Sequence, residues 1–189
     1  MRKHTIVALV EDRPGVLNKI ASKWRQRGFN IESLAVGHSE IPGLSRMTFT
    51  VDGTTTDVDQ VTKQMYKIIE VVKVSDLTEH EMVYRELALI KVGATHQQRS
   101  SVIEIANIFR AKIVDVSPES LIIEVTGTED KVDALVEMLK PFGIKELVRT
   151  GRVAMTRGAK TPLALEGEKG ETHRYRPAGE GKPRIGSLL

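Results

Sequence analysis

The hydrophobic pattern in the first half of the chain alternates between strand-like and helix-like stretches. Residues 4–10 are apolar at every position from Ile6 to Val10, which is typical of a central strand covered on both faces. Residues 16–24 then carry apolar side chains at helical spacing, and Gly28 follows as a common helix stop. Further strands are expected at 29–37, 46–51 and 71–77, with a helix from about residue 57. This βαββαβ order predicts a ferredoxin-like α+β domain over 1–77, with two helices on one face of an antiparallel sheet.

The same order of elements returns in the second half of the chain. Strands are expected at 86–93, 112–116, 121–126 and 144–148, helices at 100–109 and from 128 to about 141, and a short extra strand at 153–155. The pattern predicts a second ferredoxin-like domain over 84–158, joined to the first by the polar segment 78–84. Since each half supplies its own apolar positions, a chain cut after Asp76 is expected to fold.

Residues 159–189 lose the periodicity of the preceding elements. Glycine, proline and charged residues alternate there without a regular apolar face. Such a composition buries too little apolar area to offset the entropy of ordering the chain. We therefore expect a flexible tail.

Composition narrows the class of protein. The sequence has no cysteine, which excludes disulfides, zinc–thiolate sites and cysteine nucleophiles, and favours a cytoplasmic location. No apolar run approaches the roughly 20 residues of a membrane-spanning helix. The 28 Lys and Arg residues exceed the 25 Asp and Glu residues by only three, so no clustered basic surface for nucleic acid is expected.

Two functional classes remain as weaker alternatives. An RNA-recognition domain shares the βαββαβ order, but it stacks bases on aromatic side chains of the central strands, and residues 4–10 contain none. An enzyme would need an acid, base or nucleophile set. The five histidines lack metal-ligand spacing, and Ser45 beside Arg46 has no Ser-His-Asp pattern around it.

The turn after the first strand carries the strongest candidate chemistry. Asp12 is placed to cap the coming helix, and Pro14 with Gly15 suits its first turn. Asn30, at the start of the next strand, is expected at the same edge. Free backbone N–H groups and the helix dipole favour a carboxylate there, so the turn suits the charged end of a small zwitterion. The alternative is a purely structural turn.

Several runs of residues resemble a known family. Val10-Glu11-Asp12-Arg13-Pro14-Gly15-Val16-Leu17 resembles the amino-acid-binding ACT domain. The runs at 27–34 (RGFNIESL) and 44–48 (LSRMT) are similar to the regulatory, or small, subunit of acetolactate synthase, also called acetohydroxyacid synthase. The similarity continues more loosely through 109–116 and 152–158.

The resemblance implies a protein without catalytic machinery of its own. It would activate a catalytic large subunit, which would carry thiamine diphosphate, magnesium and FAD, and confer feedback inhibition by valine in branched-chain amino acid (valine, leucine and isoleucine) biosynthesis. The first domains would form a homodimer with valine at the interface. The implied contacts are Asp12, Gly15 and Val16 from one protomer and Asn30 and Ile31 from the other. An ACT-type sensor that regulates a different enzyme is the competing interpretation, and leucine or isoleucine are open as effectors.

Overall fold

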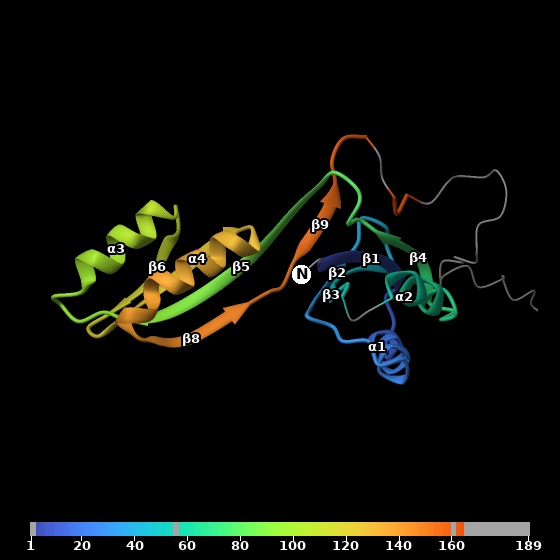
Figure 1. Cartoon of the computed structure of the whole chain (residues 1–189), viewed down its shortest axis with the longest axis horizontal. Coiled ribbons are helices and arrows are strands. Elements are labelled where there is room, and N and C mark those ends of the chain that lie inside the picture. The colour runs from blue at the N-terminus through green and yellow to red at the C-terminus, as the bar shows by residue number, and fades with distance from the viewer. Residues whose placement is uncertain (1–2, 55–56, 160–161, 165–189) are drawn as a thin grey trace, which may run out of the picture.

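The computed structural model describes residues 3–54, 57–159 and 162–164, which form two antiparallel sheets with helices packed on one face of each (Figure 1). The two sheets lie side by side along the long axis of the molecule, and one long strand runs from one to the other. We call residues 3–76 the first domain and residues 86–149 the second. The predicted α+β class is confirmed.

The first domain has the predicted βαββαβ order. Its elements are β1 (Lys3–Glu11), α1 (Val16–Gln26), β2 (Ser33–His38), β3 (Leu44–Asp52), α2 (Val58–Met65) and β4 (Val71–Asp76). The strands lie in the order β2-β3-β1-β4, so β1 is central and β2 is an edge strand.

The main core of the first domain lies between the sheet and its helices. Ile6, Ala8 and Val10 of β1 are fully buried there. Trp24 of α1 packs against Phe49 of β3, with ring centroids 4.7 Å apart. Because β1 has neighbours on both sides and cover on both faces, its apolar run is buried as the sequence predicted.

The opposite face of this sheet is covered by residues from far along the chain. Alternate side chains of a strand point to opposite faces, so Val7 and Leu9 point away from the helices. They cluster with Leu44, Leu77 and Ala154. Ala154 follows the second domain in sequence, so the first domain does not complete its own packing, contrary to the expectation above.

The second domain repeats the order of the first. Its elements are β5 (Met82–Gly93), α3 (Arg99–Ile108), β6 (Lys112–Ser117), β7 (Ser120–Gly127), α4 (Glu129–Leu139), the 3₁₀ turn η1 (Lys140–Phe142) and β8 (Ile144–Arg149), followed by β9 (Val153–Thr156). The strand order is β6-β7-β5-β8. Its core lies between this sheet and the helices α3 and α4.

Strand β5 belongs to both halves of the molecule. From residue 86 onward it pairs with β7 and β8, whereas residues 82–85 pair antiparallel with β9. We call residues 82–85 together with β9 the β5–β9 ribbon. The extra strand expected at 153–155 is therefore confirmed as β9, and the segment predicted as a linker already becomes strand at Met82.

The chain continues to pack after β9. Leu163 is only 3% exposed and lies in the cluster that covers the helix-free face of the first sheet. Lys73 Nζ donates a hydrogen bond to the backbone oxygen of Ala164 at 2.7 Å. The predicted flexible tail therefore begins too early at residue 159, and its part from 165 to 189 lies outside the described residues. No helix in the described part of the chain is long and apolar enough to span a membrane.

Candidate functional site

Backbone hydrogen bonds hold the turn between β1 and α1. The N–H of Asp12 donates to the oxygen of Gly43 at 2.9 Å, and the N–H of Arg13 donates to the oxygen of Glu11 at 3.0 Å. Gly15 has φ +88°, in the left-handed region that glycine adopts without steric cost. The turn conformation thus accounts for the glycine at this position.

The start of α1 lacks a side-chain cap. Gly15, rather than Asp12, directly precedes the helix, and no side chain among the described residues accepts a hydrogen bond from its first turn. The prediction that Asp12 caps the helix is therefore wrong. Uncapped N–H groups at a helix start favour an anionic ligand, because the helix dipole adds to their hydrogen-bonding capacity.

The Asp12 carboxylate is directed toward the end of β2. Its Oδ2 lies 3.1 Å from Nδ1 of His38, and its side chain is 44% exposed. The strand register explains this contact, since His38 pairs with Ser45 and Ser45 pairs with Val10 near the end of β1. No sequence pattern pointed to His38, because only the pairing of three strands brings it to the turn.

Asn30 and Ile31 lie at the other end of α1. The helix has 11 residues, so its rise of about 1.5 Å per residue separates its two ends by roughly 16 Å. The next residue, Glu32, directly precedes β2, and its carboxylate lies 3.2 Å from Nζ of Lys3, the first residue of β1. The expectation that one chain brings Asp12 and Asn30 to the same edge is therefore wrong. Within one chain, Asp12 and Asn30 lie at opposite ends of α1.

The environments of the two apolar site candidates differ. Val16 is 3% exposed and belongs to the main core of the first domain. Its side chain is thus committed to packing, and only its backbone could meet a ligand. Leu17, the next residue, is 41% exposed at the same turn. Ile31 is half-buried against the core.

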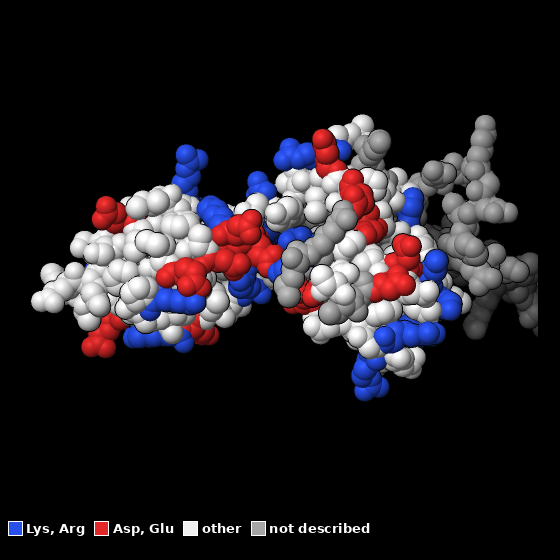
Figure 2. All heavy atoms as spheres, in the orientation of Figure 1, with Lys and Arg blue, Asp and Glu red and all other residues white. Residues whose placement is uncertain are grey.

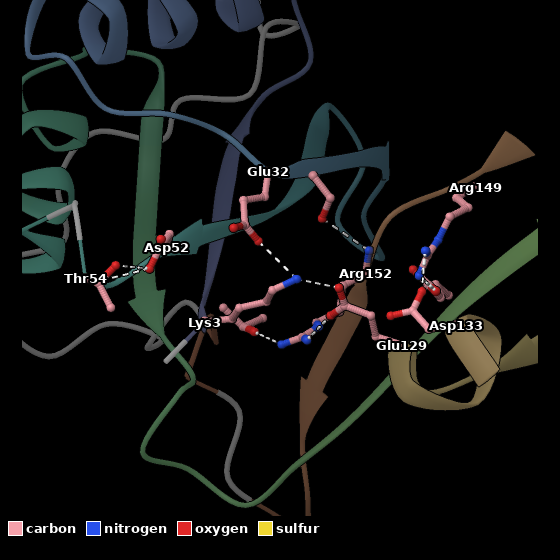
Figure 3. A network of polar contacts seen from close by, with 11 residues as sticks. Lys3, Glu32, Asp52, Thr54, Glu129, Asp133, Arg149 and Arg152 are labelled. Carbon is pink, nitrogen blue, oxygen red and sulfur yellow. Dashed lines mark hydrogen bonds and ion pairs between the residues drawn. The ribbon is translucent and has the colours of Figure 1, made fainter. Parts of the chain in front are cut away.

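A cluster of charged side chains joins the two domains (Figure 3). Nζ of Lys3 lies 3.2 Å from Glu32 and 2.5 Å from Glu129 of α4, and Glu129 also accepts a hydrogen bond from Arg152 at 2.9 Å. We call Lys3, Glu32, Glu129 and Arg152 the junction cluster. Figure 2 shows acidic side chains gathered over the α4 side of the second domain as far as this junction. Arg152 therefore pairs within the chain, with Glu129 of the second domain.

The junction charges shift one another's ionisation. The hydrogen bond from Lys3 to Glu129 raises the pKa of Lys3 more than burial lowers it. Burial alone would raise the pKa of Glu129, but Lys3 and Arg152 outweigh it and hold that pKa below its ordinary value. Lys3 and Glu129 therefore both favour their charged forms.

We expect acid to weaken the junction. The folded pKa of Glu129 lies below its unfolded value of about 4.3, so the unfolded chain binds this proton first. The stability that the carboxylate contributes is present above the unfolded pKa and is lost as pH falls through the folded one. Melting temperatures measured from about pH 7 to about pH 3 should fall less steeply in Glu129→Gln than in the wild type. Equal slopes in the two proteins would contradict this expectation.

An apolar groove of about 380 Å³ lies between β2 and the β5–β9 ribbon. Val36, Val153 and Met155 line it and are about half exposed. The guanidinium of Arg46 enters the groove and donates to the backbone oxygen of Ala154 at 2.9 Å, and burial lowers its pKa. The edge strand β2 is thus flanked by a mainly apolar surface.

Comparisons with known proteins agree with this architecture. Residues 6–73 match the family described as AHAS small subunit-like ACT domain, and residues 85–158 match the family described as small subunit of acetolactate synthase. The probable acetolactate synthase small subunit of Archaeoglobus fulgidus is 57% identical over 158 residues, covering 84% of this chain and 99% of that protein. The chain belongs to the acetolactate synthase small subunit family.

Further members of this family support the assignment. The acetolactate synthase small subunit of Mycobacterium bovis is 50% identical over 159 residues, which cover 84% of this chain and 95% of that protein. The crystal structure of the small subunit from Thermotoga maritima is 44% identical with a TM-score of 0.77, covering 85% of this chain and all of that one. This acetolactate synthase small subunit is therefore a non-catalytic regulatory subunit, and the interpretations as an RNA-binding module, an independent enzyme or the regulator of a different enzyme are set aside.

Proposed function

We propose that this small subunit binds the catalytic large subunit of acetolactate synthase, raises its activity and makes it sensitive to valine. The observation that carries the proposal is the uncapped start of α1 beside Gly15 and the exposed Asp12 carboxylate, within a chain of this family. Thiamine diphosphate, magnesium and FAD would reside on the large subunit. The pathway is branched-chain amino acid biosynthesis.

The valine site would form between two copies of the first domain. In the described sheet β2 is an edge strand, and its own residue Val36 is about half exposed. If two copies of β2 pair antiparallel across a two-fold axis, the start of one strand meets the end of the other. Asn30 of one protomer then approaches the Asp12 turn of its partner. The 16 Å separation within one chain is thereby bridged.

Each part of the amino acid has a suitable contact in this arrangement. The valine carboxylate would bind the N–H groups at the start of α1, and its ammonium would pair with Asp12. Its aliphatic side chain would contact Leu17 and, across the interface, Ile31. Val16 would contribute through its backbone, because its side chain is buried in the core.

The direct test is an assay of the large subunit with and without this chain during a valine titration. We expect the chain to increase turnover, and valine to reverse that increase. Separate titrations with leucine and isoleucine identify the effector. Activity unaffected by the chain, at concentrations where the two proteins co-elute, would refute the proposed function.

We expect Asp12→Ala and Asp12→Ser to weaken valine inhibition to the same degree. A charge-assisted hydrogen bond contributes about 1.5–3 kcal/mol, so affinity should fall roughly 10- to 100-fold. Because Asp12 does not cap α1, the ligand-free melting temperature should change little in either variant. Valine titrations and thermal unfolding measure both quantities.

Two further variants complete the test of Asp12. Asn30→Ala should weaken valine binding from the other side of the interface. Asp59→Ala removes an exposed carboxylate of the first domain away from the turn and serves as the control. If Asp12→Ser binds valine as tightly as the control, the turn is not the ligand site.

A further inference from the structure

The residues that follow Asn30 and Ile31 contact the segment between the second domain and β9. The N–H of Glu32 donates to the oxygen of Thr50 at 2.9 Å, and its carboxylate pairs with Lys3. The hydroxyl of Ser33, the first residue of β2, accepts a hydrogen bond from the backbone N–H of Arg152 at 3.4 Å. Two residues thus separate the proposed valine contacts from the segment between β8 and β9.

The backbone around Gly151 lies against Ser33. A Cβ atom added at Gly151 would lie 2.8 Å from the Cβ of Ser33, closer than two such atoms can approach. Gly151 also has φ +76°, which favours glycine. Because the two segments are in close contact, a displacement of Ser33 toward Gly151 must displace Gly151 as well.

Arg152 connects this contact to three elements. Its guanidinium donates to Oγ1 of Thr5 in β1 at 2.8 Å and to Glu129 in α4 at 2.9 Å, and it lies 4.3 Å from the ring centroid of Tyr84 in β5. The Arg152 side chain is only 12% exposed. A buried charge that loses its partner is strongly unfavourable, so Arg152 and Glu129 should move together.

The junction has room for a second arrangement. A cavity of about 350 Å³ adjoins the cluster between the domains, lined by Lys3, Glu32, Glu129 and Arg152 among others. Long charged side chains that border such a space can exchange partners without first being packed into an apolar core. We take the present pairing as one of two arrangements of the junction.

We propose that the Arg152–Glu129 pair couples occupancy of the valine site at Asn30 and Ile31 to the position of the second domain. This inference rests on the proposed function, because it takes the start of β2 as a valine contact. Valine would shift Glu32 and Ser33, and Gly151 and Arg152 would carry that shift into α4 and β9. Arg152 then acts on inhibition without touching the ligand.

The chain offers a matched control for Arg152. Arg149 borders the same cavity and binds two carboxylates, Glu86 and Asp133. Both of its partners belong to the second domain, whereas Arg152 bridges the two domains. Arg152→Met and Arg149→Met therefore remove the same charge and retain a similar apolar stem, but only the first removes a contact between the two domains.

The experiment compares valine binding with valine inhibition. Calorimetric titration of the isolated small subunit gives the dissociation constant for valine, and the assay of the reconstituted holoenzyme gives maximal inhibition. In Arg152→Met we expect the dissociation constant to change less than about threefold while maximal inhibition falls at least about twofold. Glu129→Gln weakens the same ion pair and should change the dissociation constant and maximal inhibition in the same way as Arg152→Met. Arg149→Met should match the wild type in both quantities.

The possible outcomes distinguish this inference from the proposed function. Three results would each overturn the coupling. They are full inhibition in Arg152→Met, an equal loss of maximal inhibition in Arg152→Met and Arg149→Met, and loss of valine binding in Arg152→Met. A wild-type holoenzyme that ignores valine would overturn the proposed function instead. In that case scanning calorimetry of the ligand-free chain still tests whether Arg152 couples the two domains. We expect two unfolding transitions in Arg152→Met and a single transition in Arg149→Met. A single transition in Arg152→Met would reject the coupling.

Discussion

Gly15→Asp is expected to abolish valine inhibition while leaving activation of the large subunit in place. An aspartate at the residue before α1 can accept hydrogen bonds from the N–H groups of the first turn. It would therefore occupy the positions proposed for the ligand carboxylate and repel that carboxylate by charge. Losing a charge-assisted interaction of about 1.5–3 kcal/mol weakens binding on the order of 10- to 100-fold, and repulsion adds to the loss.

The variant Gly15→Ala distinguishes two causes of lost inhibition: competition of the new carboxylate with valine for the N–H groups of α1, and backbone strain at position 15. Both variants carry a Cβ at φ +88°, where a non-glycine residue costs about 1–2 kcal/mol, but alanine has no oxygen to offer the helix. The space around a Cβ at this position is open, so no collision adds to that cost. Valine titration should show that Gly15→Ala retains inhibition with weakened affinity. Complete loss in the alanine variant would mean that strain, and not competition for the N–H groups, removes the site.

A chain cut after Asp76 is expected to lose most of its stability. The cut removes Ala154 and Leu163, which together with the β5–β9 ribbon cover Val7 and Leu9. Burial of one such side chain contributes about 1.5–3 kcal/mol, so uncovering Val7, Leu9 and Leu44 costs about 5–9 kcal/mol. Domain stabilities are typically about 5–15 kcal/mol, which leaves the fragment near the limit of folding.

A second truncation provides the control for this loss. A chain cut after Ala164 retains β9 and Leu163. Its melting temperature and its activation of the large subunit should stay close to those of the full chain. Thermal unfolding and gel filtration of both truncated chains make the comparison. If the chain cut after Asp76 is monomeric and has the same melting temperature as the full chain, the first domain does not need the cover over Val7 and Leu9 for its stability.

The sequence by itself determined the local elements and their order. Apolar runs and helical spacing are properties of neighbouring residues, so the strand from Ile6 to Val10 and the helix before Gly28 could be placed without tertiary information. The repeated βαββαβ order followed from the same patterns. The motif around Asp12 and Gly15 also indicated the family, because its residues are contiguous.

The tertiary structure decided which distant residues meet. His38 reaches Asp12 through the register of three strands, and Asn30 is kept from Asp12 by the length of α1. Arg152 and Leu163 follow the second domain in sequence, yet they bind or cover the first. A periodic pattern reports that a side chain is buried but not which element buries it. Register, helix length and the path of β5 therefore fixed the junction and the separation of Asp12 from Asn30, which local patterns do not encode.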